Sequence, residues 1–322
     1  AAPQFVSAAK GTVCGCAAGL ATRDGPRLVV DGEAFAFFGI NGQFLLDPVF
    51  PEDRVEPLLA DLSARGVNAV RVWFKPEHDP ERLARLLDAG ARQDVRFVVT
   101  LADNVDRGRD WFFGDDDSAV YRPHLERTVS RFKDRPEILM WEPTNEPNCG
   151  GRFDAECVDT IKDWLTMASR LIERLDPCHL VSSGMIGAGN YDFEQDAYRQ
   201  IHRRDTIDVL SVHRRRDDAR DKELETAATL ERVAMTRLFS TGTSQALSVN
   251  SSTYQAREIP SGGKYRAFFA FNDTPPTTTI GLSRKSMTSD RKIWRSTRFI
   301  APPAPFLFRP AWSGPPAPGS PP

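Results

Sequence analysis

The chain has 322 residues, of which 40% are hydrophobic and 10% aromatic, enough for one large domain or two smaller ones. Its formal net charge of -2 gives no sign of a nucleic-acid partner, and no apolar run approaches the about 20 residues of a membrane span. The chain starts at Ala1 without a charged-then-apolar leader, and we expect the mature or trimmed form of a secreted protein.

The net charge of the whole chain conceals a change in charge balance and proline content near residue 240. Residues 1–241 hold 32 Lys and Arg against 41 Asp and Glu, whereas residues 242–322 hold 10 against 3 and also 12 of the 24 prolines. We therefore divide the chain into an N-terminal extension (1–26), a main domain (27–240) and an atypical basic, Pro/Ser/Thr-rich region (241–322). The last region is expected to be disordered or non-native.

The five cysteines lie at positions 14, 16, 149, 157 and 178, without a C-x-x-C pair or a histidine at zinc-finger spacing. No metal site is predicted. Cys149 and Cys157 bracket a short Gly-containing loop that a disulfide could close, and the alternative is that both are reduced. An odd count leaves at least one thiol unpaired.

From residue 27 on, apolar periodicity predicts strands that alternate with helices. A hairpin turned by Asp31-Gly32 comes first and runs on into a strand at 39–41. Further strands are predicted at 69–74, 97–101, 138–142, 179–183 and 207–213. The predicted helices cover 51–65, 80–89 (stopped by Gly90), 118–132, 154–175, 196–202 and 222–235.

Six strand-then-helix units favour a parallel α/β fold of the (β/α)8 TIM-barrel type, with the last two units not recognisable. Residues 240–263 have loop composition, and 265–271 could form one strand. An open doubly wound sheet is the alternative, but no G-x-G-x-x-G or P-loop follows the first strand. The Gly-rich loop 184–189 is interpreted as a plain turn.

The segment 138–147 is an apolar strand that ends in Asn145-Glu146-Pro147. Proline lacks an N–H and restricts the residue before it, so Glu146 is expected where the strand stops. In a barrel of this type catalytic groups lie at that end of the strands. The tripeptide alone would more often be a strand end with a polar turn than a site, since short motifs recur by chance.

Other predicted strands also end in polar residues, which adds Asn41, Arg71 and His213 to Asn145 and Glu146. Trp73 and Trp111 lie near them in sequence. A carboxylic acid with amide, guanidinium and aromatic neighbours suits sugar chemistry, since it can protonate a leaving oxygen. Three alternatives stay open: Arg71 could pair with a core carboxylate, the tryptophans could be packing residues, and Glu142 could be the working carboxylate.

Four motifs together carry a family resemblance: FGIN at 38–41, GVNAVRVW at 66–73, FKDRPEILMW at 132–141 leading into Asn145-Glu146-Pro147, and DVLSVH at 208–213. With them, residues from about 27 to 236 resemble the cellulase/mannanase-type glycoside hydrolases of family 5, in the retaining (β/α)8 clan. The resemblance implies that Glu146 is the general acid/base and that Asn145 binds the sugar 2-hydroxyl. It also implies that Arg71 keeps the nucleophile ionised and that His213 lines the catalytic subsite.

The family's nucleophile, a second glutamate at the end of the seventh strand, has no clear match. Glu258 is a poor candidate, and Trp294 and Trp312 are guesses for the family's eighth-strand tryptophan. Three hypotheses follow: a working glycanase, a sugar-binding barrel without the nucleophile, and a family member whose last quarter is not the native continuation. The resemblance implies a β-1,4-linked mannan or glucan as partner and no cofactor, and we expect a monomer.

Overall fold

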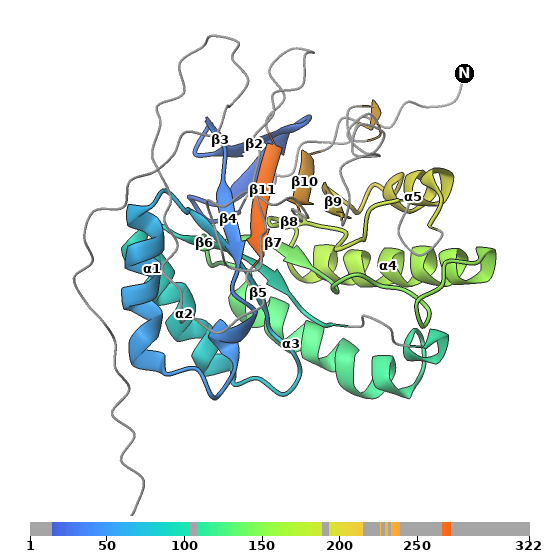
Figure 1. Cartoon of the computed structure of the whole chain (residues 1–322), viewed down its shortest axis with the longest axis horizontal. Coiled ribbons are helices and arrows are strands. Elements are labelled where there is room, and N and C mark those ends of the chain that lie inside the picture. Colours follow the sequence, from blue (N-terminus) through green and yellow to red (C-terminus); the bar gives the residue numbers. More distant parts are fainter. Residues whose placement is uncertain are drawn as a thin grey trace, which may run out of the picture.

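The computed structural model (Figure 1) describes residues 15–103, 108–188, 193–214, 226, 229–230, 233–238 and 266–271. The strands are β1 (Ala21–Asp24), β2 (Arg27–Val30), β3 (Glu33–Phe35), β4 (Phe38–Asn41), β5 (Ala69–Trp73), β6 (Arg96–Thr100), β7 (Ile138–Glu142), β8 (Leu180–Val181), β9 (Val209–Arg214), β10 (Val233–Leu238) and β11 (Arg266–Phe271). The α-helices are α1 (Val55–Ala64), α2 (Pro80–Gln93), α3 (Arg122–Phe132), α4 (Ala155–Leu175) and α5 (Gln195–His202). Short helical turns are η1 (Gln43–Leu46), η2 (Glu52–Arg54), η3 (Arg109–Trp111) and η4 (Asp116–Tyr121).

Eight strands form one sheet in the order β8-β7-β6-β5-β4-β11-β10-β9, and each pair of neighbouring strands in this order is parallel. The two strands at the ends of this order meet at an isolated parallel bridge between Ser182 and Val209. The backbone N–H groups of Ser183 and Asp208 add bonds there, to Val209 O at 3.1 Å and to Val181 O at 2.9 Å. All carboxyl ends therefore lie at one edge of the sheet.

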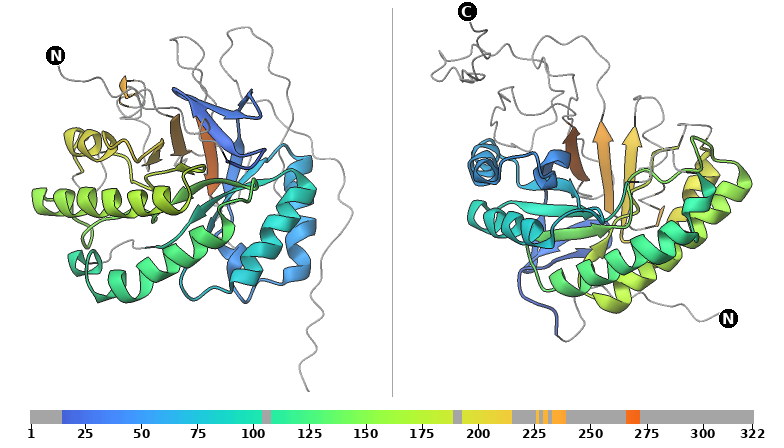
Figure 2. Two further views of the ribbon diagram at one scale, coloured as in Figure 1. Left: turned by 180° about the vertical axis from the view of Figure 1, so that it is seen from behind. Right: turned by 90° about the horizontal axis from the view of Figure 1, so that it is seen from below.

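The two faces of the sheet pack against different cores. Val70 and Val72 of β5 belong to a large core shared with the helices, which lie outside the strands (Figure 2). Ala69 and Trp73 of the same strand face a smaller core that also holds Val98, Met140, Leu180, Val209, Val233 and Met235. Because successive side chains of a strand point to opposite faces, the smaller core lies on the inner side of the curved sheet.

A three-stranded antiparallel sheet, β1-β2-β3, lies at the amino ends of the large sheet (Figure 1). Arg23 of β1 forms a buried ion pair at 3.1 Å with Asp208, directly before β9. A disulfide between Cys16 and Cys178 joins the same region to the turn before β8. These contacts place the hairpin at the end of the sheet opposite the carboxyl ends of its strands.

Most predicted elements are confirmed, including the hairpin at Asp31-Gly32. Helix α4 is capped by Asp154, whose carboxylate accepts from Cys157 N. The predicted stop of the second helix at Gly90 was wrong. Helix α2 continues to Gln93, because Gly90 gives the close approach that the Phe97 ring needs; an added Cβ would lie 2.3 Å from that ring. The Cys149–Cys157 disulfide, left open by the sequence, is present.

The structure corrects the prediction for the seventh strand. The predicted helix 222–235 was wrong at its end, because Val233–Leu238 forms β10 beside β9. The suggested strand near 265–271 is present as β11, beside β4. In the described part of the chain, helices fall short of the length and apolar character that crossing a membrane would require.

A buried cluster of polar side chains, Asp176 and His179, forms hydrogen bonds with Trp141 of β7. Trp141 Nε1 donates to Asp176 Oδ2 at 2.7 Å, and His179 Nδ1 lies 2.6 Å from the same oxygen. His179 Nε2 faces the Arg135 carbonyl at 3.0 Å, so both ring nitrogens face oxygen atoms. Burial would raise the pKa of the Asp176 carboxyl, but the bonds from His179 and Trp141 outweigh it and leave that pKa below its ordinary value.

We predict that Asp176→Asn lowers the free energy of unfolding at pH 7 by about 3 kcal/mol, since it removes a buried carboxylate that accepts from Trp141 Nε1 and His179 N. A carboxyl whose folded pKa is lowered stabilises the fold above its unfolded pKa and loses this effect as pH falls through the folded value. Urea unfolding should therefore show that the difference in unfolding free energy between the unmodified protein and Asp176→Asn becomes smaller as pH falls from about 4 toward 2. Asp159→Asn, at an exposed position of α4, is the control. A free-energy difference for Asp176→Asn that stays constant with pH would contradict the lowered pKa of Asp176.

Candidate active site

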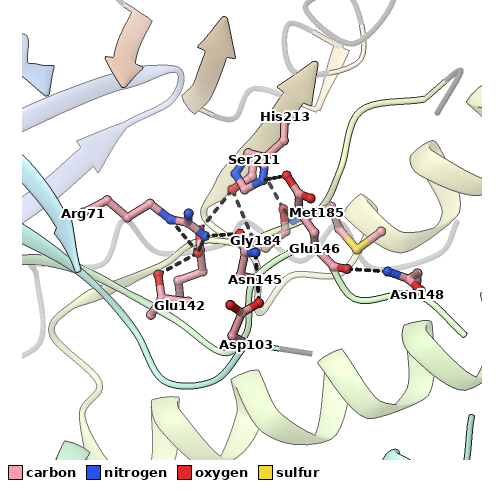
Figure 3. A network of polar contacts seen from close by, with 12 residues as sticks. Arg71, Asp103, Glu142, Asn145, Glu146, Asn148, Gly184, Met185, Ser211 and His213 are labelled. Carbon is pink, nitrogen blue, oxygen red and sulfur yellow. Dashed lines mark hydrogen bonds and ion pairs between the residues drawn. The ribbon is translucent and has the colours of Figure 1, made fainter. Parts of the chain in front are cut away.

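Most of the polar residues singled out in the sequence gather at the carboxyl ends of the strands (Figure 3 shows Arg71, Asn145, Glu146 and His213). Asn41, the last residue of β4, lies opposite Arg71 of β5 in the parallel register. Glu142 ends β7, and His213 belongs to β9. All four are buried, so this edge of the sheet carries charge and hydrogen-bonding capacity that the protein itself must compensate.

Glu142 is the centre of this group. Arg71 donates to its Oε1 from Nε at 2.8 Å and also from Nη2, and the Thr100 hydroxyl donates to the same oxygen at 2.9 Å. The hydroxyls of Ser182 and Ser211 approach Oε2 at 3.1 Å and 3.4 Å. Both carboxylate oxygens are thereby engaged, and Glu142 is the counter-ion of Arg71. Of the roles open to Arg71, pairing with a core carboxylate is the one that the described contacts contain.

Asn145 is held in a single orientation by its neighbours. Arg71 Nη2 donates to its Oδ1 at 2.9 Å, and its Nδ2 donates to Asp103 Oδ1 at 3.1 Å. Its backbone N–H reaches Ala102 O at 3.0 Å, which attaches the segment to the end of β6. The amide therefore has a fixed face for a ligand beside Glu146.

Glu146 has a φ of 45°, a left-handed conformation that is strained for a side chain with a Cβ. Its N–H donates to Gly184 O at 2.8 Å, and Asn148 Nδ2 donates to its carbonyl at 3.1 Å. Its carboxylate Oε1 lies 3.0 Å from His213 Nδ1. The strain is thus maintained from both sides of the residue and directs the carboxylate toward β9.

Gly184 makes this conformation possible. Its φ is +64°, and an added Cβ would lie 1.9 Å from Thr144 O and 2.9 Å from Glu142 Cγ. The loop that begins here was interpreted as a plain turn, but its first residue packs directly against the Glu146 segment. Only glycine suits both the backbone angle and the space.

A second layer of hydrogen bonds fixes β8 and β9 behind the site. Ser183 Oγ accepts from Ser211 N at 3.1 Å and lies 2.8 Å from His202 Nε2, whose ring also reaches Tyr198 O through Nδ1. Burial lowers the pKa of His202 to about 4, so the ring is neutral at physiological pH. A neutral ring whose Nδ1 donates to a carbonyl can accept from Ser183.

The two tryptophans lie in different surroundings. Trp73 is buried beside Arg71, whose guanidinium carbon is 4.2 Å from its ring centroid. Trp111 packs against Phe112, Tyr121 and Trp164, with ring centroids 5.2 to 5.5 Å apart. Trp73 thus belongs to the site, whereas the described contacts of Trp111 match the packing alternative.

The sequence missed several members of the site: Thr100, Asp103, Ser182, Gly184 and Ser211. They were detectable as polar or small residues at strand ends, but only the fold shows that they converge on Glu142 and Asn145. Glu258, Trp294 and Trp312 lie outside the described residues. Within the described ranges, no group of three or more His, Cys, Asp or Glu side chains could hold a metal ion.

Comparison with known proteins fits this geometry. Residues 110–237 match the family model described as GH family 5 beta-mannosidase-like. The chain contains a glycoside hydrolase family 5-like segment. Mannan endo-1,4-beta-mannosidase F of Aspergillus fumigatus is 26% identical over 209 residues, which cover 52% of this chain and 46% of that protein. Mannan endo-1,4-beta-mannosidase 2 of Oryza sativa subsp. japonica is 26% identical over 51% of this chain and 47% of its own. The family 5-like chain thus spans about half the length of these curated relatives.

Solved structures show the same fold around the family 5-like segment. The endo-1,4-beta-mannanase from Rhizomucor miehei matches with a TM-score of 0.59 at 18% identity, covering 67% of this chain and 80% of that one. The beta-mannanase from the blue mussel Mytilus edulis matches with a TM-score of 0.57 at 14% identity, covering 80% and 92%. At these identities the likeness concerns the fold.

We predict that Gly184→Ala distorts the site, because the new methyl group would overlap Thr144 O. The expected result is a loss of about 2 kcal/mol or more of unfolding free energy, measured by urea denaturation. Gly66→Ala is a matched control, since Gly66 also has a positive φ, +87°, but has open space at its Cβ. Equal losses in the two variants would show that backbone strain alone, and no clash, explains the effect.

Proposed function

We propose that the protein is a glycoside hydrolase that cleaves β-1,4-linked mannan, with Glu146 as the general acid/base. The observation that carries this is the buried Glu146–His213 contact beside the Arg71–Asn145 bond at the carboxyl ends of the strands. The names of the curated relatives, which are mannan endo-1,4-beta-mannosidases, support mannan over glucan as the substrate.

The proposed barrel is a closed (β/α)8 ring. Its support is the Ser182–Val209 bridge between the two strands that end the sheet order, together with the neighbouring backbone bonds. The strand order, with β10 and β11 between β9 and β4, supports the proposal that they are the seventh and eighth strands of a ring that starts at β4. Closure would bring Asn41, Arg71 and His213 around one mouth.

In the proposed reaction the Glu146 carboxyl protonates the glycosidic oxygen as the bond to the anomeric carbon breaks, and water finally supplies the hydroxyl on that carbon and returns a proton to Glu146. His213, 3.0 Å from Oε1, orients this carboxyl, and the Asn145 amide, fixed by Arg71 and Asp103, binds a hydroxyl of the sugar in the catalytic subsite. Trp73 and Asn41 complete the walls of the proposed sugar-binding subsite. Trp111 remains a proposed contact for the outer part of a longer oligosaccharide.

One observation favours a second candidate, a sugar-binding barrel with impaired catalysis. A retaining mechanism needs two carboxyl groups about 5 Å apart. Strand β10, in the seventh position, reads Val-Ala-Met-Thr-Arg-Leu and contains no glutamate, and its Arg237 lies in register with His213. The working enzyme would need a carboxylate from another part of the chain, for which Glu258 stays the weak candidate.

We also propose that the protein is secreted and acts as a monomer without a cofactor on β-linked oligo- or polysaccharides. The two disulfides, Cys16–Cys178 and Cys149–Cys157, support an oxidising compartment, because such bonds are rare in the cytosol.

We predict that Glu146→Gln reduces the hydrolysis of mannopentaose by about 10² to 10⁴-fold, the usual contribution of a general acid, while binding of the oligosaccharide persists. Product release measured by chromatography and binding measured by calorimetry would separate the two candidates. Glu81→Gln, on the exposed face of α2, is the control and should leave both unchanged. Binding without turnover in the unmodified protein would favour the sugar-binding barrel, and turnover that is insensitive to Glu146→Gln would reject the assigned acid.

A further inference from the structure

Glu142 connects more strands than any neighbouring residue in the described contacts of the site. Its carboxylate accepts from Arg71 of β5, Thr100 of β6, Ser182 after β8 and Ser211 of β9, while Glu142 itself ends β7. Both partners of the Arg71–Glu142 pair have no exposed surface. A fully buried anion with this many donors has a fixed position.

The bonds of the guanidinium show what this position achieves. Nε and Nη2 of Arg71 are used by Glu142, and Nη2 is shared with Asn145 Oδ1. Nη1 is buried and has no hydrogen-bond partner in the described part of the protein. Asn41 Oδ1 at the end of β4 and Trp73 Nε1 at the end of β5 are also buried and have no hydrogen-bond partner among the described residues. Leaving such groups unpaired is costly, which is typical of a site that a ligand completes.

We propose that Glu142 is a positioning residue of this site, which orients Arg71 so that Nη1 stays available to a bound sugar and Nη2 holds Asn145. The carboxylate does not react, since both of its oxygens are occupied by protein donors. It also neutralises a cation that would otherwise be buried beside Glu146. This inference rests on the proposed function for its kinetic readout, and on the hydrogen bonds of Arg71 for its structural readout.

The competing explanation is that the pair only holds the strands together. In that case Glu142→Gln would reduce stability, while the folded fraction would retain its turnover number. Positioning predicts a different pattern, because a glutamine amide keeps one acceptor oxygen but carries no negative charge, so it no longer holds the guanidinium by charge-assisted bonds. The group then loses its fixed direction even in molecules that remain folded.

The test uses the full chain and the Glu142→Gln variant with mannopentaose. We expect kcat per folded molecule to fall by about 100-fold with KM changed less than about 3-fold, since oriented groups act mainly in the transition state. In ¹⁵N NMR, the Arg71 Nε–Hε signal, identified by its loss in Arg71→Lys, should be sharp and slow to exchange in the unmodified protein and should be lost or shifted in Glu142→Gln.

A milder matched pair covers the case in which Glu142→Gln does not fold. Ser182→Ala deletes a buried hydroxyl that contacts Glu142, and Ser169→Ala deletes a buried hydroxyl on α4 that bonds Thr206 instead. Only the first should lower kcat, by about 3- to 10-fold, and alter the Arg71 signal.

The two proposals fail in different ways. If the unmodified protein shows no turnover, the hydrolase proposal fails, and the Arg71 signal together with mannopentaose binding still decides the role of Glu142. The positioning role is rejected if Glu142→Gln keeps the kcat and the Arg71 signal of the unmodified protein. If Glu142→Gln does not fold, the same result for Ser182→Ala rejects it.

Discussion

The buried ion pair between Arg71 and Glu142 is the interaction on which the arrangement of residues at the carboxyl ends of these strands depends. Neither side chain touches solvent, so each requires the other: removing one charge would leave its partner uncompensated in a medium of low polarity. The pair also accounts for the hydroxyls around it, because Thr100, Ser182 and Ser211 satisfy the remaining capacity of one carboxylate. Five neighbouring strand ends thereby acquire a common centre.

The same centre determines how the chain passes from β7 to Glu146. Pro143 and Thr144 carry the backbone out of the strand, and Tyr121 from the outer layer donates to Pro143 O at 2.8 Å. Glu146 then adopts a left-handed angle that Gly184 accommodates from the next strand end. A strained functional residue thus lies between two well-bonded strands, an arrangement in which the surroundings, more than local preference, select the conformation.

The sequence predicted this architecture well where local pattern and tertiary structure agree. Helix α4 and strands β5 to β7 have clear periodicity, and the strand ends gave Arg71, Asn145, Glu146 and His213. It failed where one residue decides between alternatives. Gly90 suggested a helix stop but serves close packing, and the short apolar run at Val233 continued a helical pattern although it pairs as β10. The partners of Glu142 come from strands up to 71 residues away, which no local pattern can reveal.

The contacts of the amino-terminal sheet also bear on the order in which the protein can be completed during synthesis. Cys16 has its partner 162 residues later, and the partner of Arg23 is Asp208, 185 residues later. A ribosome adds residues from the amino end, so β1 and β2 can pair with each other early but cannot dock on the large sheet until β8 and the start of β9 have emerged. The segment of β1 and β2 is therefore synthesised before β8 and β9 but fixed only after them, and Cys16 must remain available for oxidation over that interval.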